Sequence, residues 1–260
     1  MAENIKTARI LKFDIFRYNP AEPDKPPYMQ RFEVEEAPYM SLFLALNQIR
    51  EEQDSSLQFD FVCRSAVCGS CGMMVNGRPA LGCQTLTADL PEVIALHPLP
   101  TFALIGDLSV DTGRWFRSMV DRVNGWIERE TEFDRASIEA PMDNATADKI
   151  YEADRCIECG CCVAGCAVAN VRPDFLGATG LNRIARFMMD PRDQRSEQSW
   201  FEVVSDSEGV FGCIGMMACD DVCPKDLPLL EVYSYVRRKA VASLFSSGED
   251  HPARREAEKA

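Results

Sequence analysis

The sequence predicts an α+β fold in which a strand-rich N-terminal part is followed by an all-α part. Two early segments, residues 8–18 and 28–35, alternate apolar and polar side chains in the manner of paired strands. From Thr112 onward, apolar side chains instead recur at helical spacing. Most of the twelve cysteines fall into three clusters with regular internal spacing. The change of pattern indicates two domains, and the cysteines indicate where each domain would bind a cofactor.

We expect the first domain to span residues 1–110 and the second to span residues 111–245. A chain of 260 residues is long enough for one or two domains. The segment 246–260 is rich in charge and has no apolar pattern, so it is predicted to be a disordered tail.

In the first domain, a polar, proline-rich turn joins the two predicted strands. Ser41 is placed to cap a helix over the segment SLFLALNQIREE, whose apolar residues recur at helical spacing. A cysteine loop follows, then a short strand, an Asn76-Gly77 turn typical of tight hairpins, and a return to Cys83. Hairpin, helix, cysteine loop and hairpin, in this order, are typical of a β-grasp domain of the plant-type ferredoxin kind.

The second domain is predicted to begin with a helix that Asp111 or Thr112 caps. The apolar side chains of this helix form one stripe, which we expect to pack in the core. The stripe consists of Trp115, Phe116, Met119, Val120, Val123, Trp126 and Ile127.

Three more helices are expected in the second domain. One starts at about Ala147 and leads into the second cysteine cluster. Another covers residues 181–189 and stops before Pro191, because proline lacks the N–H of a helical residue and its ring clashes with the preceding turn. Asp226 and Pro228 open the last one.

The first cysteine cluster has the spacing of a [2Fe–2S] ligand set. Its gaps read C-x4-C-x2-C-x11-C, and the plant-type ferredoxin loop likewise supplies three closely spaced thiolates. Gly69 and Gly72 allow the loop to wrap closely around inorganic sulfide and to direct backbone N–H groups at the cluster. The predicted ligands are Cys63, Cys68, Cys71 and Cys83.

The second and third clusters predict two more iron–sulfur centres. The second reads C-x2-C-x2-C-x3-C, and the third reads as the same motif followed by proline, with Met216 at its second cysteine position. In two-cluster ferredoxins the fourth cysteine of each run ligates the cluster of the other run. A [4Fe–4S] centre is therefore predicted on Cys156, Cys159, Cys162 and Cys223. The remaining set, Cys166, Cys213 and Cys219, predicts a [3Fe–4S] centre, because a thioether is a weak ligand beside a thiolate.

Disulfides and zinc are the alternatives to iron–sulfur clusters. The start MAENIKTARI lacks the apolar stretch of an export signal, which disfavours an oxidised, secreted protein. Zinc binds paired C-x2-C motifs, but its sites do not usually combine the two kinds of spacing found here. Cys161 fits neither ligand register and is expected to be a packed, buried thiol.

Composition excludes several other classes. The net charge of −13 disfavours binding to nucleic acid, whose phosphates would repel it. No apolar run approaches the roughly 20 residues that a spanning helix needs. With only His97 and His251, the chain has little scope for histidine-ligated metal, haem or a Rieske centre.

At this point the sequence resembles a known family. The motifs CRSAVCGSC, CIECGCCVAGC, GLNRIARFMMDPRDQR and CIGMMACDDVCPKDLP, in this order, are similar to those of the iron–sulfur subunits of succinate dehydrogenases and fumarate reductases. The resemblance covers most of the chain. It implies a β-grasp domain with a [2Fe–2S] centre and a helical ferredoxin-type domain with [4Fe–4S] and [3Fe–4S] centres. The ligands of the family fall on the cysteines already assigned by spacing.

The resemblance also implies two partner subunits. One is a flavoprotein with FAD and the dicarboxylate site, and the other is a membrane cytochrome b that handles quinone. This chain would relay electrons between them from the cytoplasmic face of the membrane, while FAD and haem b stay in the partners. No catalytic residue is expected in this chain.

Two positions depart from the ubiquinone-reducing members of the family. Those members have a histidine directly after the equivalent of Cys213 and a tryptophan five residues beyond the equivalent of Cys166, whereas this chain has Ile214 and Val171. The pattern is more similar to the dihaem cytochrome type, in which quinol is oxidised within the membrane subunit. The predicted function is therefore electron transfer in a membrane-bound quinol:fumarate reductase of anaerobic respiration.

Other functions remain open at this stage. The same clusters serve a succinate dehydrogenase that runs in the opposite direction, and the ligands do not set the direction. A free ferredoxin-like carrier would usually be smaller. Electron-transfer subunits of the heterodisulfide or glycolate-oxidase type carry paired ferredoxin runs, but they lack the first cysteine loop.

Overall fold

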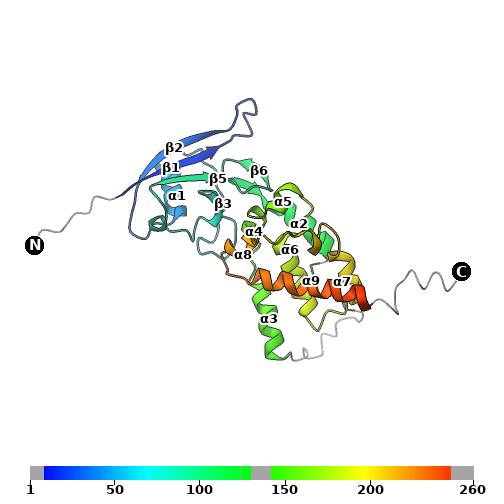
Figure 1. Ribbon diagram of the computed structural model, residues 1–260. Helices are drawn as coiled ribbons and strands as arrows, with labels where there is room; N and C mark the ends of the chain where they lie inside the picture. Colours follow the sequence, from blue (N-terminus) through cyan, green and yellow to red (C-terminus); the bar gives the residue numbers. More distant parts are fainter. Residues whose placement is uncertain (1–8, 124, 130–141, 247–260) are drawn as a thin grey trace, which may run out of the picture.

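Two structural units lie side by side in the computed structural model, a strand-rich unit (blue to cyan) and a helical unit (green to red) (Figure 1). The structure describes residues 9–123, 125–129 and 142–246. The order of strands and helices confirms the α+β fold with an N-terminal β-grasp unit and an all-α unit after it.

Within the described residues, five strands form one mixed sheet in the order β2-β1-β5-β3-β4. β1 pairs with β2 in antiparallel and with β5 in parallel orientation, and β3 pairs with β4 and β5 in antiparallel orientation. The bounds are β1 (Ile10–Arg17), β2 (Tyr28–Glu35), β3 (Gly72–Val75), β4 (Arg78–Leu81) and β5 (Val93–His97). A smaller sheet consists of β6 (Ala103–Gly106) and β7 (Ser109–Asp111), and a 3₁₀ turn covers Thr87–Asp89.

The core of the first unit follows from the alternation along β1. Leu11, Phe13 and Ile15 all point to the buried face, where they meet the apolar side of α1 (Leu42–Glu52). The predicted cap is confirmed, because the Ser41 hydroxyl accepts a hydrogen bond from the N–H of Leu44 at 3.4 Å. The strands β5, β6 and β7 were not expected, because short segments give too little alternation to detect.

The second unit is built from helices around α6. Its longer helices are α2 (Thr112–Val123), α3 (Asn144–Asp154), α6 (Gly177–Met189), α7 (Glu197–Val204) and α9 (Leu229–Ser246). Short helical turns are α4 (Cys161–Ala164), α5 (Ala167–Val171), a 3₁₀ turn at Val210–Gly212, and α8 (Ala218–Asp221). α6 packs against α3 and α9, and the buried residues of α2, α6, α7 and α9 form one apolar core.

The helix boundaries differ from the sequence prediction at three places. α3 begins three residues before Ala147, because the Asp143 side chain caps it by accepting from the N–H of Thr146 at 3.0 Å. α6 begins at Gly177, earlier than the predicted residue 181. The predicted stripe of α2 extends too far, because the helix ends at Val123 and Trp126 is 60% exposed.

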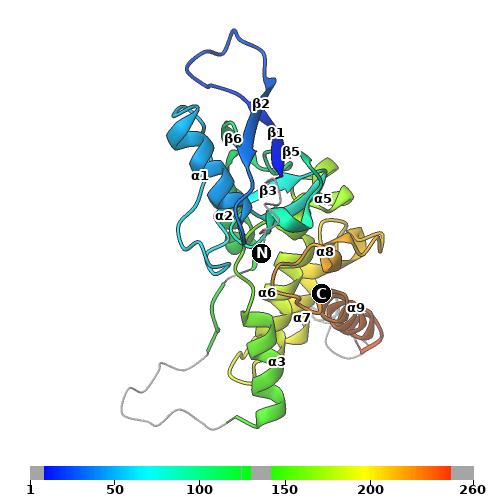
Figure 2. The same cartoon turned by 90° about the vertical axis from the view of Figure 1, so that its left-hand side faces the viewer.

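Viewed from the side, the β1–β2 hairpin and α3 project at opposite ends of the molecule (Figure 2). Among the helices of the described residues, none combines the length and apolarity needed to cross a membrane. The predicted disordered tail, residues 246–260, lies outside the described residues apart from Ser246, the last residue of α9.

Candidate iron–sulfur sites

The first site is a loop between α1 and β3 whose backbone N–H groups point at sulfur. The Cys63 Sγ accepts from the N–H groups of Ser65, Val67 and Cys68 at 3.3–3.4 Å. The N–H of Cys83 reaches the Cys71 Sγ at 3.5 Å, so the return after β4 closes the site. Backbone donors directed at sulfur are the arrangement that a thiolate-bound cluster requires.

Electrostatics within this loop favour thiolate where the chain is exposed. The hydrogen bonds from the Ser65 and Val67 backbones lower the pKa of Cys63 to about 6. Burial raises the pKa of Cys71 to about 12, so this thiol would lose its proton only to a metal. Cys68 is exposed, which places one edge of the site at the molecular surface. These four thiols fit the donor set of a [2Fe–2S] centre.

The second site is a cavity between the start of α4 and the end of α8. Four predicted ligands line it, three from the first ferredoxin run and one from the second: Cys156, Cys159, Cys162 and Cys223. The apolar side chains of Leu227 and Leu229 line the same cavity. Gly160 precedes α4 with φ +80°, a conformation that lets the chain turn sharply between two ligands. Four thiols around one largely apolar cavity fit a tetranuclear cluster.

The thiols of the second site influence one another. Burial, followed by the neighbouring Cys159, Cys156 and Cys223, raises the pKa of Cys162 well above its usual range. The pKa of Cys159 is lowered, because the adjacent thiol of Cys161 hydrogen-bonds to it. Cys161 itself is completely buried and lies among Cys71, Leu81 and Cys159.

The third site brings together the three remaining predicted ligands. Burial, together with the nearby Cys166 and Cys213, raises the pKa of Cys219 to about 11. The N–H of Gly215 points at the Cys213 Sγ at 3.4 Å. Met216, at the second cysteine position of the motif, is 63% exposed. The donor set is thus three thiols, which fits a trinuclear cluster.

In the described part of the chain, no three or more histidine, cysteine, aspartate or glutamate side chains are arranged around a single ion position. A polynuclear cluster holds its ligand sulfurs farther apart than one ion does. The fit of the three sites to clusters rests on their thiol sets and on the backbone donors.

Two polar side chains beside the sites were missed from the sequence. The Thr179 hydroxyl lies 3.5 Å from the Cys156 Sγ. The Tyr233 hydroxyl donates to the carbonyl of Val210 at 2.8 Å, and burial and the nearby Cys213 raise the pKa of Tyr233. Both residues come from long helices, α6 and α9, that carry no cysteine. Only tertiary packing brings them to the sites, so no spacing signal could have identified them.

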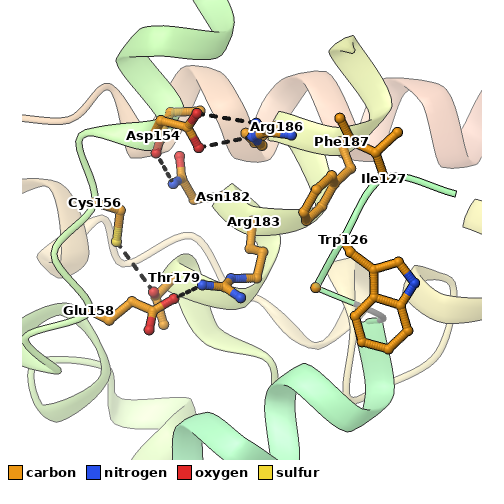
Figure 3. A pocket seen from close by; sticks show the side chains of 12 residues that line it. Trp126, Ile127, Asp154, Cys156, Glu158, Thr179, Asn182, Arg183, Arg186 and Phe187 are labelled. Carbon is orange, nitrogen blue, oxygen red and sulfur yellow. Dashed lines mark hydrogen bonds and ion pairs between the residues drawn. The ribbon is translucent and has the colours of Figure 1, made fainter. Parts of the chain in front are cut away.

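A polar pocket next to Cys156 lies between α6 and the segment that carries this cysteine (Figure 3). Arg183 points at Glu158 and forms an ion pair with it, and Arg186 pairs with Asp154 at 2.9 Å. Asn182 donates to the carbonyl of Ala153 at 2.8 Å. These contacts hold the first ligand of the second site against α6.

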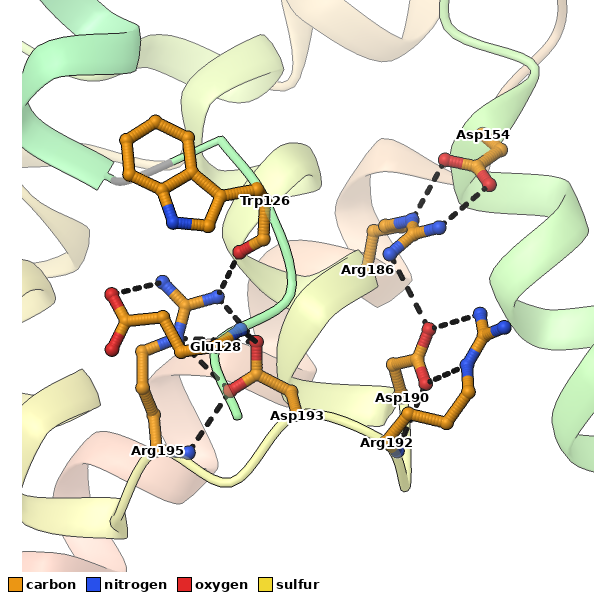
Figure 4. A network of polar contacts seen from close by, with 8 residues as sticks. All are labelled: Trp126, Glu128, Asp154, Arg186, Asp190, Arg192, Asp193 and Arg195. Atoms are coloured by element: carbon orange, nitrogen blue, oxygen red, sulfur yellow. Dashed lines mark hydrogen bonds and ion pairs between the residues drawn. The ribbon is translucent and has the colours of Figure 1, made fainter. Parts of the chain in front are cut away.

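A second polar network explains the charged end of the motif GLNRIARFMMDPRDQR (Figure 4). The buried Asp190 bonds to Arg192 at 2.8 Å, and Arg195 donates to the carbonyl of Trp126 at 3.0 Å. The guanidinium of Arg195 also stacks on Trp200, 3.8 Å from the ring centroid. The network ties the turn after α6 to the segment after α2, and its role is structural.

Comparison with known proteins finds two iron–sulfur families in this chain. Residues 12–117 match the family described as 2Fe-2S iron-sulfur cluster binding domain, and residues 152–227 match the 4Fe-4S dicluster domain.

Curated relatives cover nearly the whole chain. The chain is 51% identical over 235 residues to the fumarate reductase iron-sulfur subunit of Wolinella succinogenes, an alignment that covers 90% of this chain and 98% of the relative. It is 37% identical over 222 residues to the succinate dehydrogenase iron-sulfur subunit of Coxiella burnetii, covering 84% and 91%. A chain in the solved structure of the Mycobacterium smegmatis Sdh1 complex in the apo form matches with a TM-score of 0.82 at 22% identity, covering 93% of this chain and all of that one. This last likeness concerns the fold.

Proposed function

The chain belongs to the family of iron–sulfur subunits of succinate dehydrogenases and fumarate reductases, and from this premise we propose that it relays electrons in a membrane-bound quinol:fumarate reductase. Its partners are a flavoprotein subunit, which holds FAD, and a membrane anchor subunit. This chain contributes the series of iron–sulfur centres that connects them, and it contributes no substrate-binding residue.

Residues 1–110 form the domain of the first centre, and residues 111–245 form the domain of the other two. The ligands are Cys63, Cys68, Cys71 and Cys83 for [2Fe–2S], Cys156, Cys159, Cys162 and Cys223 for [4Fe–4S], and Cys166, Cys213 and Cys219 for [3Fe–4S]. The observation that carries this proposal is the position of Cys223, which lines one cavity with the first three cysteines of the other run. When bound, the clusters supply one-electron redox chemistry. The chain binds them, buries them and donates hydrogen bonds to their sulfurs.

Exposed apolar side chains beside the first and the third site support two docking surfaces. Val62 and Val67 are exposed beside Cys68 of the first site, and we assign this surface to the flavoprotein. Ile214 and Met217 are exposed within two residues of Cys213 and Cys219, and Val171 is exposed at the end of the short helix that follows Cys166. We assign this surface to the membrane subunit. The chain is then peripheral, on the cytoplasmic face of the membrane.

The side chains at the third site support quinol oxidation within the membrane subunit. Val171 and Ile214 carry no donor or acceptor that could hold a quinone carbonyl. A cytochrome b of the dihaem type would then pass electrons through haem to the [3Fe–4S] centre. The reverse direction, succinate oxidation, remains the second candidate, because the succinate dehydrogenase subunit of Coxiella burnetii is also a relative.

Cysteine-to-serine variants of the purified complex test the crossed ligand sets. Under the proposal, Cys223→Ser should lose the [4Fe–4S] signal in electron paramagnetic resonance, and Cys166→Ser should lose the [3Fe–4S] signal. Cys161→Ser is the control and should retain all three signals. If each run instead binds its own cluster, Cys166→Ser would lose the [4Fe–4S] signal and the assignment would be wrong.

The direction and the partner are tested on the same complex. It should contain haem b in the membrane subunit and should reduce fumarate with a low-potential quinol faster than it oxidises succinate with the matching quinone. A complex without haem would refute the cytochrome b partner, and a complex that oxidises succinate faster than it reduces fumarate would support the second candidate.

A further inference from the structure

We infer that Gly69 is a positioning residue that sets the separation between the first and second iron–sulfur sites. A Cβ atom at Gly69 would lie 2.8 Å from the Cys159 Cα, 2.9 Å from the Cys159 Cβ and 2.9 Å from the carbonyl oxygen of Ile157. The loop that holds the first site therefore rests directly on the backbone of a ligand of the second site. The inference rests on the proposed function, since it concerns electron transfer between those two sites.

The surrounding contacts make this approach rigid. Gly72, at the start of β3, lies on the same ligand, and a Cβ there would be 3.1 Å from the carbonyl oxygen of Cys159. In addition, Cys71 of the first site and Cys159 of the second site share one buried cluster with Cys161 and Leu81. Main-chain atoms and close-packed side chains cannot move aside as the end of a long side chain can.

The consequence is a shorter path for the electron. In the step concerned, one cluster loses one electron and the other gains it, and no bond forms or breaks. The rate of such a transfer falls steeply with distance, so any group that pushes the two loops apart slows it. A methyl group at Gly69 would have to displace either the first loop or the backbone of Cys159.

The test compares Gly69→Ala with Gly77→Ala in the purified complex. Both glycines have positive φ, +76° and +81°, so alanine strains the backbone to a similar degree in each. Only Gly69 meets the second site, because nothing lies within 4 Å of a Cβ at Gly77. Gly77→Ala is therefore a matched control for backbone strain without the contact.

Spin relaxation reports the separation independently of activity. In the wild type, reduction of the [4Fe–4S] cluster should increase the microwave power needed to saturate the signal of the reduced [2Fe–2S] cluster. Gly69→Ala should lose part of this increase at unchanged iron and sulfide content, and its electron transfer should slow several-fold. Gly77→Ala should match the wild type in both measurements.

Gly72→Ala is a second variant, because Gly72 is not among the residues with positive φ and its contacts are longer. It should change the relaxation in the same direction as Gly69→Ala and by less. Unchanged relaxation in Gly69→Ala with both clusters present would overturn the inference and leave the proposed function intact. Loss of a cluster in both variants would also overturn it, since the glycines would then serve assembly. A wild-type complex without the two signals would instead refute the proposed function.

Discussion

Removal of the Thr179 hydroxyl should lower the reduction potential of the [4Fe–4S] centre. This hydroxyl lies 3.5 Å from the Cys156 Sγ, and once that sulfur binds iron as a thiolate only the hydroxyl can donate. Thr179 is 3% exposed, so its hydroxyl is shielded from bulk solvent. A hydrogen bond to sulfur stabilises the more negative, reduced cluster, and Thr179→Val removes it with almost no change in side-chain shape.

The size of the shift follows from the strength of one hydrogen bond. Such a bond contributes about 0.5–1.5 kcal/mol, and for a one-electron couple about 59 mV corresponds to about 1.4 kcal/mol, which sets an upper bound of about 20–60 mV. The bound applies because part of the bond strength is common to both oxidation states.

Redox titration of the purified complex, followed by electron paramagnetic resonance, measures the shift. Thr179→Ser keeps the hydroxyl and is the matched control, so its midpoint potential should stay close to that of the wild type. A midpoint that is the same in Thr179→Val, or that falls equally in both variants, would refute the role of the hydrogen bond and leave packing as the cause.

Three further changes have distinct expected outcomes. Met216→Cys should add a thiolate and one iron to the third site and should lower the reduction potential of that centre. The cost in stability should be small, since Met216 is largely exposed. A [3Fe–4S] signal that persists in the air-oxidised variant would contradict this. The Ser56 hydroxyl is the main cause that lowers the pKa of Asp54 from 3.8 to about 2, so the ionised carboxylate contributes about 2 kcal/mol of stability above about pH 4 that is lost as the pH falls toward 2. Asp54→Asn should therefore unfold at lower urea concentration than the wild type at pH 7, and a gap that stays constant down to pH 2 would show that another interaction is responsible. Ile214→Ala and Val171→Ala should leave the KM for quinol unchanged, because both side chains are apolar and exposed, 68% and 76%; a selective rise in that KM with intact fumarate kinetics would place quinone binding on this subunit.

The fold class was predictable from the sequence and is confirmed, whereas the membership of each cysteine set stays a prediction that rests on ligand spacing. Strand alternation predicted the β1–β2 hairpin, and the Ser41 cap marked the start of α1. Short elements such as β6 and the helix α7 were not predicted, since each has few residues and no strong period. The predicted stripe was wrong at Trp126, because α2 ends at Val123 and the side chain of Trp126 is 60% exposed.

Contacts between distant segments were beyond the reach of the sequence. The glycines at 69 and 72 were expected to serve only the fit of their own loop around sulfide, whereas the structure also places them on the backbone of Cys159. Thr179 reaches Cys156 across 23 residues of chain and two helices. Such contacts depend on how α3 and α6 pack, and no local pattern encodes that arrangement.

The crossed ligand sets also bear on how the second domain folds. In the proposed assignment, Cys166 is the last cysteine of the first ferredoxin run but belongs to the third site, and Cys223 is the last cysteine of the second run but belongs to the second site. Neither site is complete until α4 packs against α8, a contact that the structure contains. Burial raises the pKa of both Cys162 and Cys219, so without iron these thiols remain neutral at pH 7, and cluster binding must release their protons. Cluster binding and the packing of α4 on α8 therefore stabilise each other, and loss of one cluster should weaken the site of the other.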